Sequence, residues 1–145
     1  MNEVGSSSTA VDVVGVNGCS GVFIWADKLY ALHTPDSDFK TDVPRLKTAV
    51  GTKASSITHV AIMAPDAHDA NTLKGLLTWT NKTPTIFTYP YTGSSKDIFT
   101  LSATMAKKGS VTYANDPLSK SPTPEGSSRS SSKSPSRSSS KGPKI

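Results

Sequence analysis

The sequence predicts an α+β fold, a mixed α/β sandwich whose elements run β-β-β-α-β-α-β-β-β, followed by a disordered C-terminal tail. Short β-branched runs alternate with two segments in which apolar residues repeat at helical spacing. The length of 145 residues suits one domain. Near the C-terminus, Ser, Pro and basic residues replace the apolar ones. We therefore expect a flexible lead over residues 1–9, a sandwich domain over 10–116 and a tail over 117–145.

The first three strands come before any helix. Residues 11–16 are short and β-branched, which is typical of a strand, and residues 17–21 (NGCSG) form a glycine-rich turn. The apolar runs 22–26 and 29–33 then predict a hairpin. Pro35 ends it, because proline cannot donate a hydrogen bond to a neighbouring strand.

Two helices are predicted after this hairpin. Asp42 is the expected cap of the first, Pro44 fits its first turn, and Gly51 fits its end. Asp66 is the expected cap of the second. The remaining strands are read from branched and apolar runs: residues 57–64, 85–89, 97–105 and 110–113.

The net charge of +5 suggests a nucleic-acid partner only until the charges are placed along the chain. Residues 1–116 hold ten basic and ten acidic side chains, so their charges cancel. The whole positive excess lies in the tail, which has six Lys or Arg and one acidic residue, Glu125. The predicted domain is thus not a uniformly basic nucleic-acid binder. No run approaches the roughly 20 apolar residues that span a bilayer, so we expect no membrane partner.

A reducing compartment fits the cysteine count. Cys19 is the one cysteine, which excludes an intrachain disulfide, and the N-terminal residues lack the pattern of a secretory signal. These features favour a cytoplasmic location, with a nuclear one as the alternative.

The tail over residues 117–145 contains twelve Ser and five Pro and no aromatic residue. Ser121, Thr123 and Ser134 each precede a proline, which makes them candidate phosphorylation sites. Each phosphate would add about −1.5 to −2 charges, so three would cancel or invert the excess. The tail is interpreted either as a phosphorylation-controlled tether for an acidic partner or RNA, or as a solubilising extension.

One pair of residues could carry chemistry, Cys19 and His33. A two-residue turn between the hairpin strands would pair Val22 with His33 and set the two side chains on opposite faces. A three-residue turn would instead pair Gly21 with His33 and make Cys19 a diagonal neighbour on the same face, about 7–8 Å away. A bulge at Gly21 would have the same effect. A Cys–His dyad therefore requires an odd turn or a bulge.

The turn around the cysteine supplies candidate oxyanion donors. Backbone N–H groups from Asn17 to Gly21, with those of Gly18 and Ser20 among them, are expected to be unpaired, so that they could hold a substrate oxygen. Cys19, His33, His59 and His68 have spacings that match no common zinc site, and the thiol chemistry needs no metal or cofactor.

The segment GVNGCSGV at residues 15–22, followed by Ala-Leu-His at 31–33, resembles the chemoreceptor glutamine deamidases of the CheD type. It is more distantly similar to glutamine-deamidating toxins such as cytotoxic necrotizing factor. The resemblance implies a mixed α/β sandwich with Cys19 as nucleophile and His33 as base. CheD-type enzymes carry a Thr six residues before the cysteine, where this chain has Val13. A backbone carbonyl, Asn17 or Asp12 would then have to orient His33, or the activity is lost.

The function expected from these observations is a thiol-dependent amidohydrolase that converts glutamine side chains of a protein substrate into glutamate. The alternative is a non-catalytic protein-interaction module of the same fold, in which the phosphorylatable tail is the working part. Val13 favours the alternative, and the intact Cys19 and His33 pattern favours the enzyme.

Overall fold

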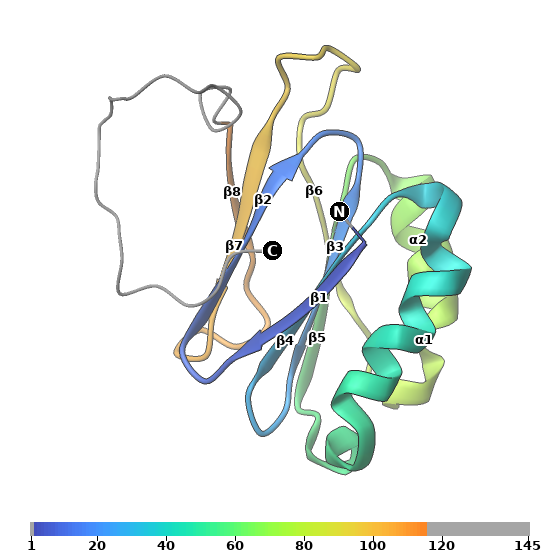
Figure 1. The fold of residues 1–145 in the computed structure, drawn as a ribbon, viewed down its shortest axis with the longest axis vertical. Coiled ribbons are helices and arrows are strands. Elements are labelled where there is room, and N and C mark those ends of the chain that lie inside the picture. Colours follow the sequence, from blue (N-terminus) through green and yellow to red (C-terminus); the bar gives the residue numbers. More distant parts are fainter. Residues whose placement is uncertain (1, 116–145) are drawn as a thin grey trace.

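The computed structural model describes residues 2–115, which form three layers (Figure 1). Two helices lie on one face of a five-stranded sheet, and a three-stranded sheet lies on its other face. This arrangement confirms the predicted α+β sandwich. The predicted tail over residues 117–145 lies outside the described residues, as does the last residue of the predicted domain.

The five-stranded sheet contains His33, and Cys19 directly precedes one of its strands. Its strands pair antiparallel, except for the last two, which are parallel. Across the sheet the order is β1 (Glu3–Ser7), β4 (Leu29–Thr34), β3 (Ser20–Trp25), β5 (His59–Ala64) and β6 (Thr85–Thr88).

The three-stranded sheet is antiparallel, with β7 at its centre. Its order is β2 (Ala10–Val16), β7 (Phe99–Thr104) and β8 (Thr112–Asn115). The predicted closing hairpin is thus confirmed as β7 and β8. Strand β2 joins this sheet while the hairpin that follows it joins the other, so the turn at residues 17–19 carries the chain from one sheet to the other.

Strands β3 and β4 are buried at every position, because layers cover both faces of their sheet. Side chains alternate between the two faces. Phe23 and Trp25 point into the core between the sheets, whereas Val22 and Ile24 point into the core beneath the helices. Any side chain on β3 or β4 can therefore be assigned to one of the two cores by its position.

The helices α1 (Phe39–Val50) and α2 (Ala67–Leu76) begin differently from each other. The Asp66 carboxylate accepts a hydrogen bond from the Asp69 N–H at 2.8 Å, which confirms the predicted cap of α2. The predicted cap of α1 is wrong. Helix α1 starts three residues before Asp42, whose buried carboxylate accepts hydrogen bonds from the Thr34 hydroxyl and the Asn2 amide. Within residues 2–115, no helix is long and apolar enough to cross a membrane.

The predicted flexible lead is also corrected, because Glu3–Ser7 form β1 and pair with β4 along its full length. Pairing satisfies the backbone groups that β4 would otherwise leave exposed at the edge of the sheet. Asn2 fixes the start of the strand through hydrogen bonds from its amide to Asp38 and Asp42. The observed order therefore has four strands before α1 rather than three.

Candidate active site

Cys19 lies at the end of the turn between β2 and β3, one residue before β3 begins. Gly18 makes this turn possible in two ways. Its φ of +79° lies in the left-handed region, which other residues rarely adopt, and a Cβ there would lie 3.0 Å from the Tyr91 hydroxyl oxygen. The backbone beside the cysteine is thus shaped by glycine and closely covered by a tyrosine.

The strand register decides between the two predicted hairpin turns. Trp25 pairs with Leu29 and Gly21 with His33, so the turn has three residues. A Cβ on Gly21 would lie 2.9 Å from a methyl carbon of Leu101, which shows that this face points toward the three-stranded sheet. Cys19 belongs to the same core between the sheets. The two residues of the candidate dyad therefore share a sheet face.

Both side chains are deeply buried. Cys19 is 4% exposed and His33 is 3% exposed. Neither ring nitrogen of His33 has a hydrogen-bond partner among residues 2–115, so the thiol and the imidazole share a sheet face without a hydrogen bond between them. Catalytic hydrogen bonds are often long in an enzyme without substrate and tighten when it binds.

Burial also determines the charge state of the pair. It raises the pKa of the Cys19 thiol, an effect that the Asn17 backbone N–H opposes by hydrogen bonding to the sulfur. It lowers the pKa of His33 to about 4. At neutral pH the resting pair is therefore a neutral thiol and a neutral imidazole, not a thiolate and an imidazolium.

None of the residues predicted to orient His33 does so. Val13 is fully buried between the sheets and offers no polar side-chain atom. Asp12 lies on the other face of β2 and accepts a hydrogen bond from the Ser102 hydroxyl. The Asn17 side chain is turned toward the loop between β6 and β7. A backbone carbonyl is excluded as well, because the ring nitrogens of His33 have no partner in the described part of the chain.

The expectation that the turn leaves its N–H groups unpaired is wrong for two of them. The Asn17 N–H hydrogen-bonds to the Cys19 sulfur, and the Gly18 N–H hydrogen-bonds to the Tyr89 hydroxyl oxygen. Buried N–H groups find partners within the protein when no ligand supplies one. Ser20 pairs with Thr34 in the sheet, and alternation directs its buried hydroxyl to the helix side, away from Cys19.

Sequence reasoning missed the segment that contacts the cysteine turn from the far side, residues 89–97 between β6 and β7. The Tyr89 hydroxyl donates to the Cys19 carbonyl oxygen at 2.5 Å, and the Tyr91 hydroxyl donates to the Asn17 amide oxygen. Figure 1 shows this connection rising beside the turn between β2 and β3. The two tyrosines on either side of Pro90 were the signal, but nothing in the spacing linked them to a turn 70 residues earlier.

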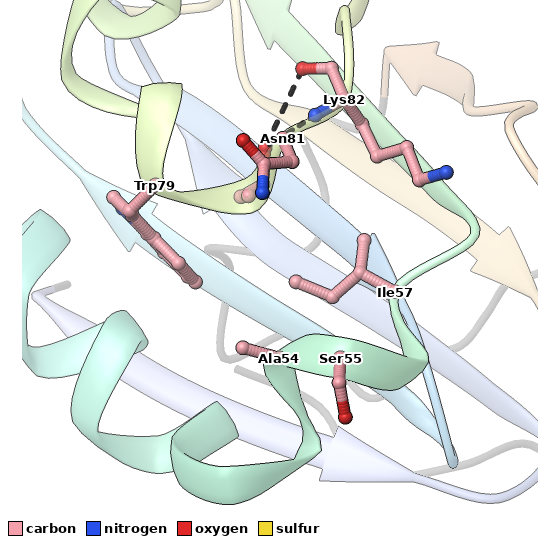
Figure 2. Close-up of a pocket in the computed structure, with 7 residues that line it drawn as sticks. Ala54, Ser55, Ile57, Trp79, Asn81 and Lys82 are labelled. Atoms are coloured by element: carbon pink, nitrogen blue, oxygen red, sulfur yellow. Dashed lines mark hydrogen bonds between the residues drawn. The ribbon is translucent and has the colours of Figure 1, made fainter.

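A separate cavity of about 290 Å³ is drawn in Figure 2. It lies near the start of β5, where His59 pairs with Trp25 at the end of β3, and thus at the opposite end of these strands from the candidate dyad. Trp79 and Ile57 supply much of its apolar wall. The Thr80 hydroxyl beside it already donates to the Leu77 carbonyl. No lining residue is a cysteine, histidine or carboxylate. The cavity is lined by Ala54, Ser55, Ile57, Trp79, Thr80, Asn81 and Lys82.

Among residues 2–115, no group of three or more His, Cys, Asp or Glu side chains is placed to hold a metal ion. No protein-family model matches the chain, and no curated protein matches its sequence.

Proposed function

We propose that the chain is a thiol-dependent amidohydrolase that deamidates glutamine side chains of a protein substrate, with Cys19 as nucleophile and His33 as base. The pairing of Gly21 with His33 is the observation that carries this proposal, since it sets the imidazole and the thiol on one sheet face. The resemblance of residues 15–22 to CheD-type deamidases supplies the substrate class.

In the proposed reaction, a His33 ring nitrogen takes the thiol proton as sulfur attacks the amide carbon of glutamine. The carbon–nitrogen bond then breaks, and the imidazolium returns the proton to the departing ammonia. Water attacks the resulting thioester, with His33 accepting its proton, and glutamate is released as the thiol re-forms. Because both groups start neutral, the proton moves during the attack rather than before it.

The unpartnered imidazole is compatible with this sequence of steps. Packing alone holds the His33 ring, since no hydrogen bond engages its nitrogens within the described part of the chain. Turning the ring toward the thiol therefore breaks no existing hydrogen bond. Substrate binding would have to supply that movement and open a path to the sulfur.

A second candidate, the non-catalytic interaction module, is favoured by the burial of both side chains and by Val13 in place of the family threonine. In this function, the basic tail over residues 117–145 would bind an acidic partner or RNA, and phosphorylation would weaken that binding. The location that we propose for either function is the cytoplasm, with the nucleus as the alternative.

Ammonia release from a panel of glutamine-containing proteins separates the two candidates. We expect the full-length chain to release ammonia, and Cys19→Ser or His33→Ala to lower the rate by about 10²–10⁴-fold. Ser55→Ala, in the distant cavity, is the matched control and should leave the rate unchanged. If wild type and Cys19→Ser release the same amount across the panel, the amidohydrolase is excluded and the interaction module remains.

A further inference from the structure

The segment over residues 90–97 is fastened to the cysteine turn mainly by polar contacts, and of its side chains Tyr91 packs against the core between the sheets. Six of its eight residues are exposed, and only Tyr91 and Asp97 are partly buried. By contrast, the residues on either side of it, Tyr89 and Ile98, are each 1% exposed. The segment is thus a surface flap between two firmly anchored ends.

One side chain of the turn, Asn17, makes most of the connections to this flap. Its amide nitrogen donates to the backbone carbonyls of Ser94 at 3.1 Å and Asp97 at 3.0 Å. Its amide oxygen accepts from the Tyr91 hydroxyl at 3.3 Å. All three contacts cross from the turn that precedes Cys19 to the flap, so a single side chain latches the two together.

The flap is also closed upon itself. The Asp97 carboxylate accepts hydrogen bonds from the Thr92 N–H at 2.6 Å and from the Thr92 hydroxyl at 2.5 Å. These bonds join Thr92 to Asp97 and do not depend on the contacts with Asn17. When the contacts to Asn17 break, residues 92–97 can therefore move as one unit.

We propose that residues 90–97 are a lid over Cys19, latched by the Asn17 side chain, and that opening of this lid admits the substrate to the thiol. The inference rests on the proposed function in one respect, since a nucleophile that is 4% exposed needs a route to its substrate. Tyr91, which covers Gly18, swings away with the lid, while Tyr89 stays and holds the Cys19 carbonyl.

The free energy of lid opening is expected to be well below that of global unfolding. Each hydrogen bond at a partly exposed site makes a small net contribution, and the apolar surface that opening exposes is chiefly the surface under the single Tyr91 ring. Local opening of this kind has little dependence on urea, whereas global unfolding depends on it steeply. The two routes to an exposed thiol can therefore be separated by experiment.

Alkylation of the full-length chain by iodoacetamide tests the lid directly, because Cys19 is its only cysteine. We expect the wild-type rate to be nearly constant at low urea concentrations. Asn17→Asp keeps the shape of the side chain but removes both donors, and we expect it to raise the rate at least about tenfold. The added carboxylate would raise the pKa of the thiol and slow alkylation, so charge cannot produce the expected increase.

Asp66→Ala is the matched control, since it removes the cap of α2 and lowers global stability without touching the lid. We expect its alkylation rate without urea to stay within about twofold of wild type. A rate for Asn17→Asp no higher than that of Asp66→Ala would overturn the lid, and so would a wild-type rate that climbs with urea as steeply as global unfolding does.

Tyr91→Phe keeps the test decisive if Asn17→Asp does not fold. It removes one latch bond and retains the ring, so alkylation should rise by about two- to tenfold, together with hydrogen exchange of the amides over residues 90–97. Unchanged values of both would again overturn the lid. Since neither measurement involves ammonia release, a failure of the lid is distinguishable from a failure of the proposed reaction.

Discussion

At the scale of single residues, the candidate site is defined by two groups whose charges burial suppresses. The thiol of Cys19 and the imidazole of His33 both resist ionisation in the core between the sheets. A general base needs a neutral imidazole, which this environment supplies, but a pKa near 4 makes it a weak one. We therefore expect His33 to accept the thiol proton only after a bound substrate or water changes the surroundings of the two side chains.

Burial of His33 makes the stability of the protein depend on pH in a defined window. The unfolded chain binds a proton near pH 6.5, whereas folded His33 does so only near pH 4. Titration of His33 thus leaves the free energy of unfolding unchanged above pH 6.5 and lowers it as the pH falls from 6.5 to about 4. Below about pH 4, His33 causes no further loss. The loss attributable to His33 is about 3 kcal/mol, a net value that already includes the charge of Glu3, its partner on β1, which raises the pKa of His33.

Urea unfolding of wild type and His33→Gln between pH 7.5 and pH 4 measures this effect. Glutamine has a similar size and does not titrate, so its cost is the same at every pH. We expect the unfolding free energy of wild type to fall more steeply than that of the variant. Parallel curves would mean that His33 titrates alike in the folded and unfolded states.

At the scale of elements, sequence patterns predicted those parts that depend on local chemistry. The hairpin of β3 and β4, the cap at Asp66 and the helix end at Gly51 follow from runs of apolar residues and from the special conformations of Asp and Gly. The hairpin pattern allowed two turn lengths, and only the observed pairing selected the one that brings Cys19 and His33 to one face.

Elements that depend on distant partners were missed for a physical reason. Strand β1 is rich in serine and has no apolar alternation, so its pairing with β4 leaves no trace in its own sequence. The sequence of the lid, residues 90–97, likewise predicts an ordinary polar loop. Its role comes from Asn17, more than 70 residues away.

The attachment of β1 gives an element-scale prediction. The Asn2 amide donates to Asp38 at 2.7 Å and to the buried Asp42 at 2.6 Å. Asn2→Ala should lower the free energy of unfolding by about 1–3 kcal/mol, because bonds to charged groups are strong and a buried carboxylate loses a donor. Chemical denaturation measures the change. A loss below about 0.5 kcal/mol would show that the Asn2 side chain contributes little to holding β1.

At the scale of the whole molecule, the five-stranded sheet separates two cores that differ in composition and role. The core beneath the helices is built mainly from aliphatic side chains, together with Tyr30 and Phe39, and anchors the sheet. The core between the sheets also contains Cys19 and lies beside His33, so the distance between the sheets sets the room around the candidate site. A hydrogen bond from the Trp25 ring to the Thr104 carbonyl, at 2.8 Å, fixes that distance at one end.

Gly21 fixes the distance between the sheets at the other end, next to the candidate dyad. An added Cβ would lie 2.9 Å from Leu101 and 3.0 Å from Phe23, two fully buried side chains. Gly21→Ala should therefore push the sheets apart and lower the free energy of unfolding by about 1–3 kcal/mol.

Gly75, in α2, is the matched control for this substitution, because a Cβ there meets nothing within 4 Å and its φ is not positive. Gly75→Ala should raise the free energy of unfolding by up to about 1 kcal/mol, since alanine favours a helix more than glycine does. Thermal and urea unfolding of both variants measure the two effects, which should have opposite signs. A neutral Gly21→Ala would mean that the sheets can part without cost, and the tight packing around Cys19 and His33 would then not restrain their approach.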